Sequence, residues 1–218
     1  MRRAAKILKV HQVTVARKLR FMAEQERVRH GKFLREFSKS ALISNIHFDD
    51  METFEHTKCK PVSIPIIVEP ESRKILGLSV ASMPAKGLLV RISVKRYGPR
   101  RDDRAQAWNE LLNSLKPYIH EKAHFSSDEN PHYPPHIRRN YPSASHSTFK
   151  GRRGCVVGQG ELKRGGFDPL FPLNHSCAMI RANLNRMFRR TWCTTKKISS
   201  LADHLAIYIG YHNRLLTA

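Results

Sequence analysis

The hydrophobic pattern of this chain changes its period near residue 40, and that change limits the folds open to it. From Arg3 to about Phe37 the chain contains no proline, and apolar residues recur at the three- and four-residue spacing of an amphipathic helix. From Ile43 onward, short runs rich in valine and isoleucine follow, a pattern typical of strands. The chain therefore predicts a helical segment over residues 1–40 and an α/β domain over residues 41–218.

Three strands are predicted at the start of the second region, over Ile43 to Asp49, Pro61 to Val68 and Lys74 to Ala81. The polar segment Pro70 to Arg73 is short enough for a hairpin turn, so the second and third strands should be antiparallel. Pro65 has no backbone N–H to donate, which indicates an edge strand or a bulge.

An amphipathic helix is predicted from about Asp102 to Glu121, kinked or ended by Pro117. Its apolar stripe consists of Ala105, Trp108, Leu112, Leu115 and Ile119. A short strand, 123–126, then leads to Asp128, and a second is predicted at 145–148. Loops are expected over 130–141, which is rich in proline and tyrosine, and over the glycine-rich basic segment 151–166.

The chain ends in two predicted helices, from Leu173 to Met187 and from Leu201 to His212. The whole order after residue 41 is strand, strand, strand, helix, strand, strand, helix. This is the order of a ribonuclease H-like α/β domain, in which helices flank a mixed sheet. The order alone indicates a fold class and no function.

The charge balance points to a polyanionic partner. Lys and Arg number 39 against 18 Asp and Glu, which gives a formal net charge of +21 and a pI near 10.4. No apolar run is long enough for a transmembrane helix, and the residues after Met1 are too broken in hydrophobicity for a secretory signal, so we expect a cytoplasmic, nucleoid-associated protein. The four cysteines are scattered, which argues against structural zinc or a disulfide framework.

Within the N-terminal segment, residues 5–19 resemble a helix-turn-helix motif with Lys9 at the turn position. The small Ala5 would let two helices approach, and the predicted contact between them consists of Leu8, Val10 and Val15. The residues expected to face outward and meet DNA are Gln12, Thr14, Arg17 and Lys18. The alternative is an amphipathic basic helix that packs on the main domain.

Two aspartates follow candidate strands, Asp49 after the first and Asp128 after the fourth. Metal-dependent phosphoryl chemistry requires acidic oxygens that converge from different elements, because Mg²⁺ prefers oxygen ligands and must keep places for the phosphate and the nucleophile. Each aspartate alone also fits a solvated turn at a strand end. Together with the positive charge, the pair favours a metal site for nucleic-acid chemistry.

From Ile43 onward the chain resembles the DDE-type insertion-sequence transposases. The resemblance rests on three segments and a basic run: residues 48–54 (FDDMETF), 127–133 (SDENPHY), 172–181 (PLNHSCAMIR) and 189–197 (RRTWCTTKK). It implies that Asp49 and Asp128 are the first two metal-binding residues and that Asn174 stands where the third, usually Glu, would be. Arg181, seven residues later, would share a helix face with Asn174 and bind phosphate.

Asn174 leaves three interpretations open, because a neutral amide is a poorer Mg²⁺ ligand than a carboxylate. The site is an Asp-Asp-Asn set, or the copy is inactive, or Glu161 supplies the missing oxygen. Asp168 is a weaker substitute that fits a turn residue better.

The resemblance implies a transposase that cleaves DNA strands at the ends of its own insertion element and transfers them to target DNA, with two Mg²⁺ or Mn²⁺ ions and a dimer or higher oligomer on the DNA. The arginines expected to hold phosphates are Arg181, Arg186, Arg189 and Arg190. Two alternatives remain: a catalytically inactive DNA-binding protein derived from a transposase, and another nuclease of the ribonuclease H-like fold.

Overall fold

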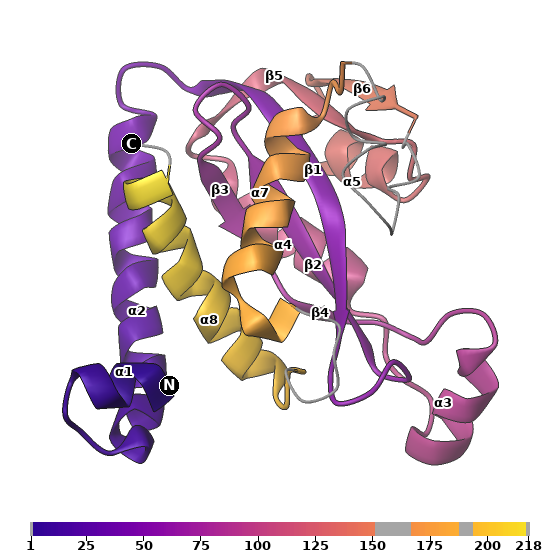
Figure 1. Cartoon of the computed structure of the whole chain (residues 1–218). Coiled ribbons are helices and arrows are strands. Elements are labelled where there is room, and N and C mark those ends of the chain that lie inside the picture. Colours follow the sequence, from indigo (N-terminus) through magenta and orange to yellow (C-terminus); the bar gives the residue numbers. More distant parts are fainter. Residues whose placement is uncertain (1, 151–166, 188–193, 217–218) are drawn as a thin grey trace.

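The computed structural model describes residues 2–150, 167–187 and 194–216. Among these residues, a mixed sheet of six strands has the order β3-β2-β1-β5-β6, with β4 paired to β2 (Figure 1). The strands are β1 (Ile43–Phe54), β2 (Pro61–Val68), β3 (Ile75–Leu78), β4 (Ala81–Ser82), β5 (Ile119–Asp128) and β6 (Ser145–Phe149). β2 runs antiparallel to β1, β3 and β4, whereas β5 runs parallel to β1 and to β6. The predicted α/β class, a mixed sheet flanked by helices, is confirmed.

The β2–β3 hairpin forms as predicted, but the placement of Pro65 at an edge or a bulge is wrong. β2 lies between β1 and β3, and Pro65 pairs with Asp50 of β1. Its carbonyl accepts a hydrogen bond from the Ser79 amide at 3.1 Å. On that side β3 pairs with residues 66–68 of β2 and β4 with residues 62–63, so Pro65 falls where the ladder is interrupted and no N–H is required.

Strands β1 and β5 are longer than their sequence patterns indicate. β1 continues five residues beyond Asp49, because residues as far as Phe54 pair with β2. We expected Asp49 to end a strand, and this is wrong, because Asp49 lies inside β1. The parallel ladder with β5 nevertheless ends nearby, at the pair His47 and Ser126. Ile119, expected at the end of a helix, instead begins β5.

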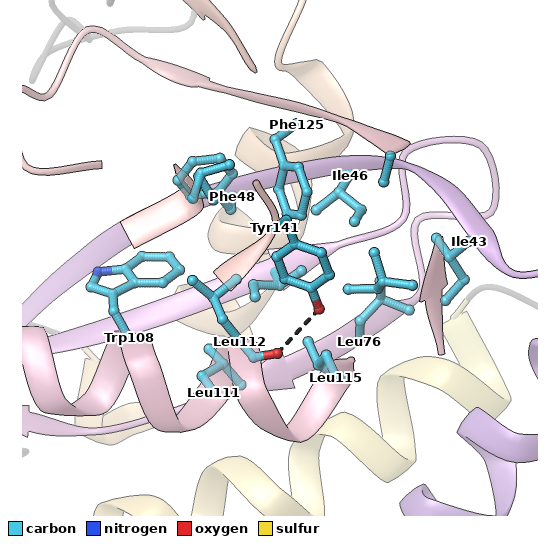
Figure 2. Close-up of a cluster of buried hydrophobic side chains, with 14 of the residues drawn as sticks. Ile43, Ile46, Phe48, Leu76, Trp108, Leu111, Leu112, Leu115, Phe125 and Tyr141 are labelled. Atoms are coloured by element: carbon cyan, nitrogen blue, oxygen red, sulfur yellow. Dashed lines mark hydrogen bonds between the residues drawn. The ribbon is translucent and has the colours of Figure 1, made fainter. Parts of the chain in front are cut away.

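One face of the sheet is covered by α4 (Arg104–Leu115) and α5 (Tyr133–Asn140). The helix before β5 thus ends two residues before Pro117, which cannot continue it. The core on this face joins Phe48 and Phe125 of the sheet to Trp108, Leu112 and neighbouring side chains of α4 (Figure 2). The Tyr141 hydroxyl donates to the Leu112 carbonyl at 3.1 Å and closes this core.

The other face is covered by α7 (Phe171–Asn183), a short 3-10 turn at Asn185–Met187 and α8 (Ile198–Tyr211), which ends in a π-helical turn at His212–Leu216. Its core joins Met51 and Ile64 of the sheet to Leu173 and Ile180 of α7 and Leu205 of α8. Both C-terminal helices are confirmed, although α7 ends before Leu184 and Met187.

The N-terminal segment forms α1 (Arg2–Ile7) and α2 (Gln12–Phe37), with a turn in which Lys9 has a φ of 52°. Ala5 is buried as predicted, but Leu8 and Val10 are 63% and 42% exposed. They do not form the helix–helix contact of the predicted helix-turn-helix motif, because α1 is too short to cover them. Val15 is partly buried.

The second half of α2 belongs to the main body, where it lies beside α8 (Figure 1). Glu26 of α2 is buried and accepts hydrogen bonds from Arg29 and from Arg214, the latter at 2.8 and 3.2 Å. Gly210 of α8 makes this close approach possible, because a Cβ there would lie only 2.0 Å from the Glu26 carboxylate. No helix in the described ranges is both long and apolar enough to cross a membrane.

Candidate active site

The parallel register brings Asp49 and Asp128 together. Asn45, Ile46 and His47 of β1 pair with His124, Phe125 and Ser126 of β5. Asp49 and Asp128 each lie two residues beyond the last pair, so they stay in step at the carboxyl edge of the parallel strands and on the same face of the sheet. That face is the one covered by α7. The predicted pairing of these two aspartates is thus present in the fold.

Hydrogen bonds fix one carboxylate oxygen of Asp49. Its Oδ1 atom accepts from the Tyr133 hydroxyl at 2.9 Å and from the Asp50 amide at 2.7 Å. The Asp50 amide also donates to the Tyr133 oxygen, at 2.9 Å, so the three groups form a closed set. Tyr133 is 1% exposed and cannot be displaced without opening the core.

The electrostatic setting of Asp49 disfavours its ionised form. Burial, above all, raises its pKa to about 6, and the negative charge of Asp128 acts in the same direction. The bonds from Asp50 and Tyr133 oppose this shift without cancelling it. Burial raises the pKa of the Cys177 thiol on α7 to about 12, and the Asp49 charge adds to that shift, as expected where α7 passes over this aspartate.

Asp128 ends β5 and turns the chain toward α5. Its Oδ1 atom accepts from the Asn130 amide at 3.1 Å, and Asn130 Oδ1 in turn accepts from the His132 amide at 3.1 Å. These two turns lead directly into Tyr133, whose amide donates to the Asn130 carbonyl. The loop after one aspartate therefore carries the tyrosine that holds the other.

Asn174 occupies the second turn of α7 and is exposed. Its side-chain amide donates to Asp168 Oδ2 at 2.9 Å, while Asp168 Oδ1 accepts from the Leu170 amide at 3.0 Å. Asp168 is therefore a turn residue at the start of α7. Among the described residues, no group of three or more His, Cys, Asp or Glu side chains is arranged to hold a metal ion. Glu161 lies outside the described residues.

The loop before α7 nevertheless approaches β1. Burial lowers the pKa of His47, which shares a face with Asp49, and the charges of Glu69 and Asp168 act against that shift. His47 Nδ1 is buried and has no hydrogen-bond partner in the described part of the chain. Asp168, and Asn174 bonded to it, thus border the side of β1 on which Asp49 lies.

The predicted DNA-binding side chains fall into three groups. Gln12, Thr14, Arg17 and Lys18 are all exposed on the first turns of α2, and Arg181 is exposed at the end of α7. Arg186 is partly buried, and burial lowers its pKa, so it is a less accessible phosphate ligand than we expected. Arg189 and Arg190 lie outside the described residues.

Two features of this region escaped the sequence reasoning. Tyr133 and the helix α5 lie in the segment expected to be a loop, because Pro134 and Pro135 indicate irregular structure. Proline is, however, favoured in the first turn of a helix. The spacing of Tyr133, Ile137 and Tyr141, all buried, is that of one helix face and was the available signal. The second feature is α3 (Leu89–Tyr97), which no prediction covered.

Comparison of the sequence with protein-family models gives no match, and none of the curated proteins compared with it is significantly similar.

Proposed function

We propose that this chain is a transposase-type enzyme that cleaves and joins DNA strands at a divalent-metal site formed by Asp49 and Asp128. The observation that carries the proposal is the parallel alignment of these two carboxylates on one face of the sheet, at its carboxyl edge. Burial is the main cause of the raised pKa of Asp49, and the negative charge of Asp128 adds to it. A positively charged ligand would relieve that repulsion.

The strand arrangement supports a ribonuclease H-like core for the proposal. Three antiparallel strands, β1 to β3, are followed by β5 and β6 on the far side of β1, each parallel to its neighbour. Helix α4 covers one face and α7 the other. This is the arrangement expected for the element order read from the sequence.

Asp49 and Asp128 fit Mg²⁺ or Mn²⁺, because both offer carboxylate oxygens, the ligands such hard ions prefer. A bound ion would act as a Lewis acid on the attacking and leaving oxygens of the phosphodiester. Asn174 is the proposed third ligand. Its side-chain nitrogen donates to Asp168, and its carbonyl oxygen would be the ligand atom.

The chain's own residues would position these groups. The Tyr133 hydroxyl and the Asp50 amide hold Asp49 Oδ1 and so fix the orientation of the carboxylate. Arg181, exposed on the helix that covers the site, would hold a phosphate of the bound strand. The formal charge of +21 would hold the duplex beside it.

The deciding experiment compares Asp128→Asn with Glu129→Gln, an exposed neighbour whose substitution changes the charge equally. Each purified protein is incubated with Mg²⁺ or Mn²⁺ and labelled duplexes that carry the ends of the DNA element encoding this chain. We expect cleavage by the wild type and by Glu129→Gln, and none by Asp128→Asn. Absence of metal-dependent cleavage in all three proteins would refute the enzymatic proposal.

One observation favours a second candidate, a DNA-binding protein without catalytic activity. The Asn174 amide is already bonded to Asp168, and no three-acid cluster occurs in the described ranges. For this candidate we expect DNA binding that is unaffected by metal, and no cleavage by the wild type. Activity gained on Asn174→Glu would identify a copy that lost its third carboxylate.

A further inference from the structure

Residues 86–101 form an arm that leaves the sheet after β4, carries α3 and returns to α4 (Figure 1). We call this segment the α3 arm. In Figure 1 it projects from the body near the turn that joins β1 to β2. Of the residues in α3, Ser93 alone is buried, and Leu89 is partly buried.

The α3 arm is attached at defined points. The Ser93 hydroxyl donates to the Cys59 carbonyl at 2.7 Å, and the Lys60 ammonium lies 4.5 Å from the centre of the Tyr97 ring. At its base, Lys86 forms an ion pair with Glu52, and Arg100 one with Glu55. The helix is therefore held in place although little of its own surface is covered.

The exposed surface of the α3 arm is basic. Residues 86–101 contain no Asp or Glu, and the basic residues are Lys86, Arg91, Lys95, Arg96, Arg100 and Arg101. The three on the helix itself, Arg91, Lys95 and Arg96, are exposed and form no ion pair with any described residue. Three uncompensated cations on a projecting helix attract an anionic partner.

The same surface is also apolar. Leu88, at the start of the helix, is 94% exposed, and Val90, Ile92 and Val94 are between 42% and 49% exposed. Apolar side chains gathered on one projecting element indicate a surface that a partner covers. A second copy of this chain, itself at +21, would repel the arm, whereas duplex DNA offers both phosphates and the apolar walls of a groove.

The arm begins close to the aspartate pair. Glu52, the ion-pair partner of Lys86 at the base, is three residues beyond Asp49 on β1, which is about 10 Å along a strand, and by strand alternation it lies, like Asp50, on the face opposite Asp49. A duplex with one phosphate at Asp49 and Asp128 would reach the arm within one helical turn, which spans roughly 34 Å.

We propose that the α3 arm binds duplex DNA beside the scissile phosphate, with Arg91, Lys95 and Arg96 on the backbone and Leu88 in the minor groove. The location beside the scissile phosphate rests on the proposed function. The binding itself does not, and it can be measured without metal or cleavage.

The test compares two triple variants of the full chain that remove the same charge. Arg91→Gln, Lys95→Gln and Arg96→Gln alter the arm; Lys39→Gln, Lys116→Gln and Lys122→Gln alter exposed cations at the opposite, amino edge of the sheet. The probe is a fluorescein-labelled mixed-sequence duplex of about 40 base pairs in EDTA, titrated at several salt concentrations, long enough for the roughly 34 Å helical turn to repeat.

We expect the arm triple to reduce the salt slope of log K by roughly 2 to 3, because each lost phosphate contact removes about 0.9. At 0.1 M salt its affinity should fall roughly 100-fold, and the amino-edge triple should stay within about threefold of the wild type. Equal effects of the two triples would overturn the proposal, because the arm would then act only through net charge.

Leu88→Asn tests the groove contact and the identity of the partner. We expect a loss of DNA affinity of about fivefold with an unchanged salt slope, because an apolar contact releases no counterions. Sedimentation at high salt should show the same mass as the wild type. Unchanged DNA affinity combined with loss of a dimer would overturn the proposal and identify a second copy as the partner.

The experiments distinguish failure of the α3 arm proposal from failure of the proposed enzymatic function. Asp128→Asn should bind the labelled duplex as tightly as the wild type while it loses cleavage. If no protein cleaves DNA but the arm triple alone still has a reduced salt slope, the proposed function fails and the arm proposal stands. If cleavage occurs and the two triples bind alike, the arm proposal alone fails.

Discussion

The neighbouring aspartates of β1, Asp49 and Asp50, lie on opposite faces of the sheet and have different surroundings. On the α4 side, Asp50 accepts from Ser63 and Trp108, at 2.6 and 3.1 Å, and the positive charge of Arg104 lies near it. On the α7 side, Asp49 is also hydrogen-bonded, but its charged neighbour is Asp128. Burial raises the pKa of both groups. Asp50 thus has a cation beside it within the fold, whereas the charges beside Asp49 are acidic, and the proposed function would place a cation there.

The largest expected effect is on cleavage. Asp49→Asn should lower metal-dependent cleavage by a factor of roughly 1,000 or more, because a metal ligand supplies several kcal/mol of transition-state stabilisation. Asp50→Asn should stay within about tenfold of the wild type, per folded molecule, since Asp50 lies on the other face. Single-turnover rates measured with Mn²⁺ check both. Equal losses in the two variants would contradict the assignment of separate roles.

The next effect is on stability, and here substitution of Asp50, not of Asp49, should cause the loss. Asp50→Ala removes the acceptor of the Trp108 indole N–H and of the Ser63 hydroxyl, and should lower the free energy of unfolding by about 3 kcal/mol. Urea denaturation followed by Trp fluorescence measures it. The control is Glu129→Ala on the surface, which should change stability by less than about 0.5 kcal/mol. A loss as small as the control's would mean that water replaces both bonds.

Part of the fold and of the candidate site could be predicted from the sequence. Strand β2 and the β2–β3 hairpin followed from a local pattern of valine, isoleucine and turn residues, and so did the positions of α7 and α8. The pairing of Asp49 with Asp128 followed from their positions after apolar strand segments. The strand, the hairpin and the two helices depend on residues close to one another in the chain, whereas the meeting of Asp49 and Asp128 depends on the ladder between the distant strands β1 and β5.

Two of the features that were predicted wrongly depend on tertiary contacts. β1 extends past Asp49 because β2 pairs with it, and Pro65 is tolerated inside the sheet because β3 and β4 leave a gap beside it. The hydrogen bond that holds Asn174 joins it to Asp168 at the start of the helix, a side-chain choice that no pattern encodes. The helix of the α3 arm does carry an amphipathic pattern over its nine residues, so this helix was a local signal that the sequence reasoning missed.

A third effect concerns the pH dependence of stability without added metal. The pKa of the Asp49 carboxyl is about 6 in the folded state against an ordinary value of 3.8, so the folded state holds more protons between these values. Stability should therefore fall as pH rises from about 4 to about 6. Asp49→Asn should remove this contribution and raise the free energy of unfolding at pH 7 by about 2 kcal/mol.

Denaturation midpoints at pH 4.5 and pH 7 check the Asp49→Asn effect, and the difference between wild type and variant should be clearly larger at the higher pH. Added Mg²⁺ or Mn²⁺ should stabilise the wild type and not the variant, because a ligand that binds only the folded state raises its stability. A variant less stable than the wild type at pH 7 would contradict the view that the Asp49 charge is uncompensated.

The smallest expected effect is that of Tyr133→Phe, which tests the orientation of the Asp49 carboxylate and leaves its charge in place. Tyr133→Phe removes the hydroxyl that bonds Asp49 Oδ1 and the Asp50 amide, and should cost about 1 kcal/mol of stability. That hydrogen bond lowers the pKa of Asp49, so without it the pKa should rise further and the acid limb of the cleavage profile should move to higher pH. Tyr141→Phe is the control, because its hydroxyl bonds only the Leu112 carbonyl among the described residues. It should lose similar stability and leave the pH profile in place. If both variants shifted the profile equally, Tyr133 would act through packing alone and not as a positioning residue for Asp49.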